Sequence, residues 1–439
     1  MRERPSSRRR SARRPLLAVF AVVATTALVA SACGGSSTAS TPGVTKTAIL
    51  IGATVPLTGP AAPGYSEIAP ATNAVFKWVN AHGGVNGRMI NYDYVDDAYN
   101  PATTATKIRE LVLQDKIFAE VGGLGTPTQS AVQPFLNTEK VPQLFIASGC
   151  VCWSDPKYPE SFGWQPNYEV EGKILGSYIK NNFATKKVGY LYQNDDFGQG
   201  MTAGLDQELP ASQVVSRQSY DAATLAGPLS NQVAALKAAG AQVVVLATIP
   251  AATALTLLPA AAVGYAPQWV SSTVGDDPPT VGPLLSSYSK GKAGEALLNG
   301  MISDAYLPPE SDTSNSWIGV TKKLLADYDN HAPLDGNTEY GVALGYTFVQ
   351  ALQAAGPELT RDSLVKAIES DASSFVTPGL TPLTYSATDH YGYSGSEVVK
   401  IENGSFSTLS PVFTATNNGP VMTYTGAPSA PPTSLTSTA

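Results

Sequence analysis

Residues 48–55 read AILIGATV, an apolar run rich in β-branched side chains that predicts a buried strand. In residues 70–81 the apolar side chains recur at the spacing of one helical face, and a second strand-like run, MINYDYV, follows at residues 89–95. A strand, a helix and another strand in this order indicate a parallel α/β sheet, because parallel neighbours need a crossover connection.

The same alternation continues on both sides of residue 168 and predicts two units of one kind. The further expected strands are residues 117–121, 143–146, 187–192, 242–246 and 268–271, and the expected helices are residues 102–114, 169–183, 229–239 and 252–263. We therefore predict an α/β fold with two doubly wound parallel-sheet lobes.

The last third of the chain shows no separate core. A Pro- and Ser-rich break at residues 307–316 precedes two helical windows and then short polar strands after residue 381. We expect the chain to return to each lobe in turn. The predicted boundaries are lobe 1 at residues 47–168, lobe 2 at 169–300, the return to lobe 1 at 301–380 and the return to lobe 2 at 381–424.

The first residues have the pattern of a secretory signal peptide. Five arginines between residues 8 and 14 precede the apolar run Pro15–Ala30, which is short for a membrane span. Small residues then lead into Cys33 and resemble a bacterial lipobox, which implies cleavage after residue 32 and acylation of Cys33. The alternative is a leader cleaved elsewhere. Residues 13–17, RRPLL, also resemble a twin-arginine motif, so both the Sec and the Tat export routes stay open.

The charge balance excludes nucleic acid as a partner. Residues 1–32 hold seven arginines and one glutamate, so the formal net charge changes from −7 for the whole chain to −13 without them. Such an acidic body repels nucleic acid and anionic headgroups, and a lipid anchor must supply the membrane attachment. We predict a flexible tether at residues 33–46, a disordered tail at residues 425–439 and a location on the extracytoplasmic face of the cell membrane.

Six short motifs, in order, resemble the leucine/isoleucine/valine-binding protein family. They are PLTGP at residues 56–60, NAHGGVNGR at 80–88, DDAYNP at 96–101, VPQLF at 141–145, GWQP at 163–166 and YQNDDFG at 192–198. The resemblance implies a type I periplasmic-binding fold, in which three crossovers form a hinge and the lobes close on a small-molecule ligand. It also implies a monomer that serves an ABC permease of the branched-chain amino-acid type, without a cofactor. A ligand sensor that signals through a membrane partner is the alternative.

The Gly-rich segment GGLGTPTQ at residues 122–129 follows an expected strand and is the clearest candidate for ligand contact. Ligands bind at the carboxyl ends of strands in such sheets, and backbone N–H groups at a helix start suit a carboxylate. The alternative is an ordinary turn with Thr as the N-cap. The resemblance implies the following ligand-binding residues: Tyr65, Leu124, Thr126, Ala147, Ser148, Gly149, Phe197, Thr248 and Thr273.

Two departures from the family bear on the ligand. Thr273 stands nearest to the place where amino-acid binders of the family have an acid for the ligand α-ammonium, and Asp276 replaces that acid only if the loop is longer. Phe197 stands where a Tyr often contacts the ligand. We expect a ligand without an α-ammonium, such as an aromatic or aliphatic acid or an amide, and a solvated Asp276; a branched-chain amino acid is the other candidate.

The cysteines also depart from the family. The resemblance implies a disulfide at the positions that Tyr99 and Gly125 occupy here, so that bridge is absent. With Cys33 acylated, Cys150 and Cys152 are the two cysteines that remain. An oxidising compartment favours a disulfide between them, with free thiols or metal ligation as alternatives. Two cysteines make an incomplete metal site, so we predict no metal.

A hydrolase is the competing class of function and finds little support. His82, His331 and His390 lie in no recognisable catalytic motif, and GYSGS at residues 392–396 lacks the last Gly of a nucleophile elbow. We predict no catalytic residue and no enzymatic activity.

Overall fold

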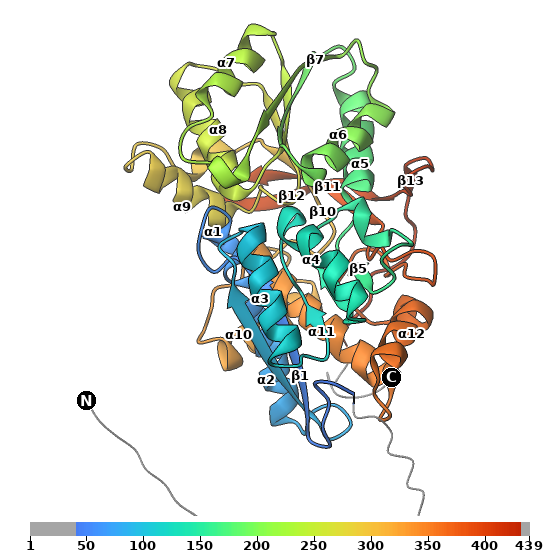
Figure 1. Ribbon diagram of the computed structural model, residues 1–439. Coiled ribbons are helices and arrows are strands. Elements are labelled where there is room, and N and C mark those ends of the chain that lie inside the picture. The colour runs from blue at the N-terminus through green and yellow to red at the C-terminus, as the bar shows by residue number, and fades with distance from the viewer. Residues whose placement is uncertain (1–40, 432–439) are drawn as a thin grey trace, which may run out of the picture. The chain divides into compact units, whose positions relative to one another are not determined.

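The computed structural model describes residues 41–431 and builds them around two sheets (Figure 1). The predicted signal peptide and Cys33 lie outside the described residues. Among those that are described, no helix is long and apolar enough to cross a membrane.

The first sheet is wholly parallel, with strand order β2-β1-β3-β4-β5. Its strands are β1 Ala48–Val55, β2 Met89–Asp96, β3 Glu120–Val121, β4 Gln143–Ile146 and β5 Ser161–Gly163. The helices of this lobe are α1 Ala62–Tyr65, α2 Ile68–Ala81, α3 Pro101–Leu113, α4 Thr126–Thr138, α10 Ser316–Tyr328, α11 Gly336–Ala355 and α12 Arg361–Asp371.

Alternation along β1 explains how the first sheet is covered on both faces. Ile49 and Ile51 belong to the cluster that includes α2 and α11, whereas Leu50 packs against α3 and α4. Side chains of a strand alternate between faces, so an apolar run such as β1 supports helices on both sides.

The second sheet has strand order β13-β12-β11-β10-β9-β8-β6-β7 and an antiparallel edge. Its strands are β6 Val188–Gln193, β7 Val214–Tyr220, β8 Val243–Ala247, β9 Gln268–Ser271, β10 Ile302–Ala305, β11 Gly395–Glu402, β12 Ser405–Thr414 and β13 Met422–Thr423. The pairs from β10 to β13 are antiparallel and the others are parallel. The helices of this lobe are α5 Tyr168–Asn182, α6 Asp196–Glu208, α7 Ser230–Ala238, α8 Pro250–Ala262 and α9 Pro278–Tyr288.

Three connections join the lobes, after β5, after β10 and before β11. Strand β10 pairs with β9 and β11, so the chain is still in the second sheet at Ala305. The boundary predicted at residue 301 therefore falls too early, because β10 has the sequence ISDA, whose two polar residues leave no apolar run as a sequence signal.

Both predicted flexible ends are shorter than expected where the structure describes them. Leu50 N donates to Gly43 O over 2.7 Å, so the tether predicted up to residue 46 already contacts the body. At the other end, Trp317 Nε1 donates to Ser429 O over 2.7 Å, so residue 429 of the predicted tail is bound to α10. Small polar composition therefore marks these segments as weak core formers, but it does not prevent backbone pairing.

Candidate functional site

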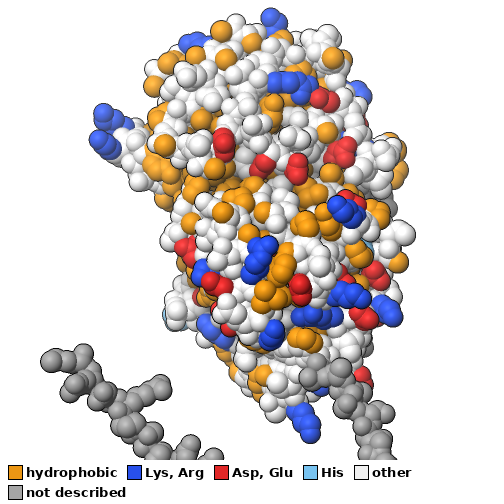
Figure 2. All heavy atoms as spheres, in the orientation of Figure 1, with side chains coloured by type: hydrophobic (Ala, Val, Ile, Leu, Met, Phe, Trp, Pro, Cys, Tyr) orange, Lys and Arg blue, Asp and Glu red, His pale blue; other side chains and the backbone are white. Residues whose placement is uncertain are grey.

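A cavity of about 140 Å³ lies between the two lobes, at the carboxyl ends of their parallel strands. Apolar side chains gather along the junction of the lobes on the face shown in Figure 2. The lining residues come from loops and helices of both lobes and from strands of the second sheet: Tyr65, Ile68, Tyr99, Leu124, Gly125, Thr126, Ala147, Gln165, Tyr168, Phe197, Ile249, Thr273, Val274, Asp276, Asp277, Asp304, Ala305, Tyr306, Leu307, Pro308, Pro309, Glu310, Gly336, Asn337, Glu339, Tyr340 and Phe406.

Most of the residues that the sequence nominates for ligand contact reach this cavity. The six that line it are Tyr65, Leu124, Thr126, Ala147, Phe197 and Thr273. Ser148 lies behind Thr126, and their hydroxyl groups are 2.7 Å apart. Gly149 and Thr248 do not line the cavity: Gly149 O accepts from Tyr168 N, and the Thr248 hydroxyl bonds to that of Thr253.

The Gly-rich segment forms the start of α4, as expected for a strand-to-helix turn. Gly125 is the N-cap residue with φ of 105°, and a side chain there would collide with the ring of Tyr99. The two positions of the family disulfide are thus in contact without cysteines. No side chain caps α4, so Thr is not the N-cap, and the Thr128 hydroxyl donates instead to Leu124 O over 2.5 Å.

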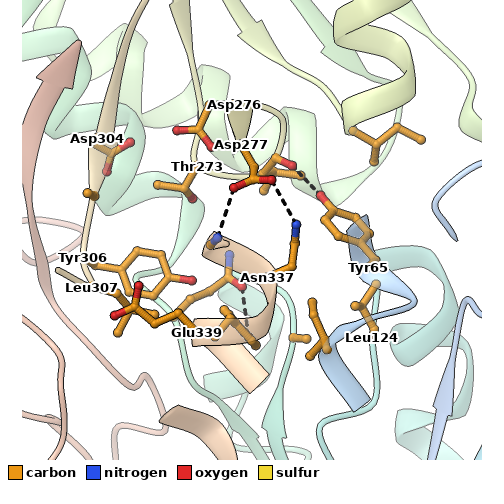
Figure 3. A pocket seen from close by; sticks show the side chains of 18 of the residues that line it. Tyr65, Leu124, Thr273, Asp276, Asp277, Asp304, Tyr306, Leu307, Asn337 and Glu339 are labelled. Atoms are coloured by element: carbon orange, nitrogen blue, oxygen red, sulfur yellow. Dashed lines mark hydrogen bonds between the residues drawn. The ribbon is translucent and has the colours of Figure 1, made fainter. Parts of the chain in front are cut away.

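Acidic side chains dominate the polar lining. They are Asp276, Asp277, Asp304, Glu310 and Glu339, and none of the described lining residues is a lysine, arginine or histidine. Figure 3 shows four of them, Asp276, Asp277, Asp304 and Glu339. Sequence reasoning considered only Asp276 from this set, because Asp304 and Glu339 lie inside a strand and a helix without any motif around them.

Asp276 is not the solvated charge that we expect from the sequence. Its side chain is only 5% exposed, and burial together with Asp277 and Asp304 raises its pKa well above the ordinary value. The loop after β9 folds inward, so Asp276 lies against the cavity that also contacts Thr273. An acid is thus present near the family position, three residues later in the chain.

Direct hydrogen bonds join the lobes across the cavity. Tyr65 Oη donates to Val274 O over 2.5 Å, and Gly336 N donates to Asp277 Oδ1 over 3.1 Å (Figure 3). Asp277 also caps α9 by accepting from Thr280 N over 3.0 Å. Burial and the nearby Asp335 raise the pKa of Asp277 to about 7. These bonds hold the lobes against each other around the cavity.

Cys150, Cys152 and the three histidines lie outside the cavity lining. Cys150 and Cys152 are joined in a disulfide at the short helical turn Val151–Ser154. His390 stacks on Phe162, and its Nδ1 lies 2.9 Å from Ser161 O, so this ring has a structural place in the first lobe.

Comparisons with known proteins agree with this geometry. Residues 48–405 match the family described as periplasmic binding protein. The Leu/Ile/Val-binding protein homolog 1 of Brucella abortus is 24% identical over 345 residues, which cover 77% of this chain and 84% of that protein.

Two solved structures share the fold. A fatty acid ABC transporter substrate-binding protein from Thermomonospora curvata superposes with a TM-score of 0.74 and 22% identity, over 87% of this chain and 97% of that chain. A branched chain amino acid ABC transporter from Thermus thermophilus with bound valine superposes with a TM-score of 0.69 and 19% identity, over 84% of this chain and 97% of that chain.

Proposed function

Because the chain belongs to the periplasmic binding protein family, we propose that it captures a small organic ligand outside the cytoplasm and delivers it to an ABC importer. The observation that carries the proposal is the cavity enclosed between two lobes that bond to each other directly. Ligands of open α/β sheets bind at the carboxyl ends of the strands, where this cavity lies. The family binds ligands and is not enzymatic, so the chain is not an enzyme.

The similar proteins and the predicted signal peptide support a more specific proposal for the permease, the membrane anchor and the ligand class. We infer a monomer that serves a permease of the branched-chain amino-acid type and is held at the cell membrane by a lipid on Cys33. The ligand classes that the relatives suggest are branched-chain amino acids, as in the valine complex, and aliphatic acids, as in the fatty acid transporter. Aromatic acids and amides complete the panel to be tested.

Hinge closure is the mechanism that the crossovers support. Three connections between the lobes allow a rigid-body closing motion, and Tyr65 and Asp277 bond across the cavity when the lobes meet. A ligand that fills the cavity adds contacts to both lobes and shifts the population toward this arrangement.

The test is a thermal shift and small-angle scattering screen of the purified protein lacking residues 1–32. A bound ligand raises the free energy of unfolding by about RT ln(1 + [L]/Kd), and the melting temperature rises with it. Closure of the lobes should also reduce the radius of gyration. Leu124→Trp fills the cavity and should abolish both effects, whereas Leu113→Trp, at an exposed leucine on α3, should leave them unchanged. The proposal is contradicted if no compound of the panel shows saturable binding. It is also contradicted if the protein converts a bound compound into a product.

A further inference from the structure

The polar part of the cavity has an excess of negative groups. Five carboxyl groups line it, without a lysine, arginine or histidine among the described lining residues. A buried carboxylate is costly unless a cation or hydrogen-bond donors accompany it. The lining residues that the structure describes do not supply that cation, so the ligand is the source that we consider.

Asp304 on β10 has the least compensated carboxyl group in the second lobe. It is 2% exposed, and neither of its oxygen atoms accepts a well-formed hydrogen bond from a described residue. Glu171 on α5 and Ser396 on β11 lie beside it, and Glu171 Oε1 accepts instead from Thr273 N over 2.7 Å. Figure 3 shows Asp304 at the cavity beside Asp276 and Thr273.

The first lobe presents a second carboxyl group of the same kind. Glu339 lies in the first turn of α11, is 2% exposed and lines the cavity. Its Oε1 has no hydrogen-bond partner among the described residues. Each lobe therefore carries a buried carboxyl group with free acceptor capacity at the same cavity.

The surroundings of these groups favour a bound proton in the absence of a ligand. Burial raises the pKa of Glu171 and of Asp304. Asp304 and Asp276 raise the pKa of Glu171 further, whereas Ser396 and Glu171 partly offset the effect of burial on Asp304. Asp276 and the phenol groups of Tyr168 and Tyr306 are the other titratable groups that face this pair. A cation that enters the cavity can replace that proton.

We propose that the cavity selects an organic amine in its protonated, positively charged form, with the ammonium group donating to Asp304 and a second donor reaching Glu339. The inference rests on the proposed solute capture and names the ligand class. Leu124, Phe197 and Val274 contact the hydrocarbon part of the ligand. A ligand carboxylate is not required, because none of the lining residues in the described part of the chain has a cationic side chain to pair with it.

The first experiment compares head groups on one branched hydrocarbon chain by isothermal titration calorimetry. The probes are 3-methylbutylamine, leucine, 4-methylpentanoate and 4-methylpentanamide, with 1,4-diaminobutane as a probe of two amine positions. We expect the amines to bind about tenfold or more tighter than the amide, and the acid to bind weakest. Equal or tighter binding of leucine, the acid or the amide overturns the inference.

The second experiment measures protons, which a neutral ligand would not displace. Titration with 3-methylbutylamine in buffers of different ionisation enthalpy should show proton release at pH 7. Affinity should rise between pH 5 and pH 8, because the carboxyl proton competes with the cation while the amine stays charged over this range. If 3-methylbutylamine binds without proton release and without this pH dependence, the ammonium group does not replace a carboxyl proton, and this part of the inference is overturned.

Variants assign the effect to Asp304. Asp304→Asn keeps the shape of the side chain and should weaken amine binding about tenfold or more, while proton release falls. Glu339→Gln should weaken the binding of 1,4-diaminobutane more than the binding of 3-methylbutylamine. Glu358→Gln, which removes an exposed charge outside the cavity, is the matched control and should change neither. Unchanged amine affinity in Asp304→Asn, with a melting curve like that of the parent, overturns the assignment.

The results also separate the two proposals. If an acid, an amide or leucine binds and amines do not, the amine inference fails while solute capture stands. If no compound of any class binds, the proposed solute capture fails and takes the amine inference with it.

Discussion

Tyr65 shows how one hydroxyl group links the lobes. It belongs to α1 in the first lobe, and its Oη donates to Val274 O in the loop after β9. Burial raises the pKa of this phenol well above its ordinary value, so the donor proton is retained at physiological pH. The bond forms only when the lobes are together. It therefore contributes to the free energy of lobe closure.

Tyr65→Phe should weaken ligand binding by about 0.5–1.5 kcal/mol, the usual net worth of one hydrogen bond. The ring stays in place, so the melting temperature of the ligand-free protein should change little. Calorimetric titration with the best ligand of the panel measures the loss. Tyr94→Phe, at a half-buried phenol outside the cavity, is the control; an equal loss in both variants would contradict the role of Tyr65.

Glu120 on β3 is a buried acid that affects stability rather than binding. Thr54 Oγ1 donates to its Oε1 over 3.1 Å, and burial raises its pKa to about 8. The folded protein thus holds a proton that the unfolded chain releases near its ordinary pKa of about 4.5. The stability from this group is complete below that value and is lost as the pH rises toward about 8.

Glu120→Gln should remove this part of the pH dependence, because the amide resembles the protonated carboxyl group and cannot ionise. At pH 8 the variant should be more stable than the parent by about 1–3 kcal/mol, the usual cost of an uncompensated buried group. Urea unfolding at pH 5 and pH 8 measures the difference. A parent and a variant with the same slope of stability against pH would show that Glu120 is ionised in the folded state.

Helices α5 and α6 together form the wall of the second lobe that carries Tyr168, Glu171 and Phe197. They pack at backbone distance through glycines: a Cβ on Gly204 would lie 2.1 Å from Glu169 O, and one on Gly172 would lie 2.3 Å from Met201 O. Neither contact has a flexible side chain that can move aside. The position of the cavity-lining side chains Tyr168 and Phe197 therefore depends on these two small residues.

Gly204→Ala should destabilise the protein by about 1–3 kcal/mol, because the added methyl group forces the helix backbones apart. Ligand affinity should fall as well, since Phe197 on α6 moves with its helix. Gly319→Ala on α10 is the control: nothing lies within 4 Å of its added Cβ, and better helix propensity should stabilise by up to about 1 kcal/mol. Equal effects of both substitutions on denaturant unfolding would argue against close packing at Gly204.

At the scale of the whole molecule, the proposed lipid anchor determines where the ligand is captured. Cys33 lies outside the described residues, and the body that follows is acidic, so electrostatics do not hold it at an anionic membrane. Cys33→Ala should therefore leave the precursor unprocessed or release the protein into the medium. Fractionation and mass spectrometry of the N-terminal peptide measure this, with Cys150→Ala/Cys152→Ala as a control that keeps the anchor. Equal membrane retention of Cys33→Ala contradicts the lipoprotein assignment.

The regular elements with strong periodicity could be predicted from the sequence. Strands β1, β4 and β9 have the predicted bounds, because each holds adjacent apolar side chains that pack inside a sheet. The family motifs likewise predicted the two-lobe fold. Strands without an apolar run were missed, such as β10 with two polar residues in ISDA and β7 with an incomplete apolar face.

The acidic character of the cavity was decided by the tertiary structure alone. Asp276, Asp304 and Glu339 are far apart in the sequence, and none of them lies in a motif. The crossovers bring β10 of one lobe and α11 of the other to the same cavity, and burial then changes the proton affinity of the carboxyl groups. A sequence pattern records periodicity along one element, whereas the charge of a binding site depends on which elements meet and on how much water they exclude.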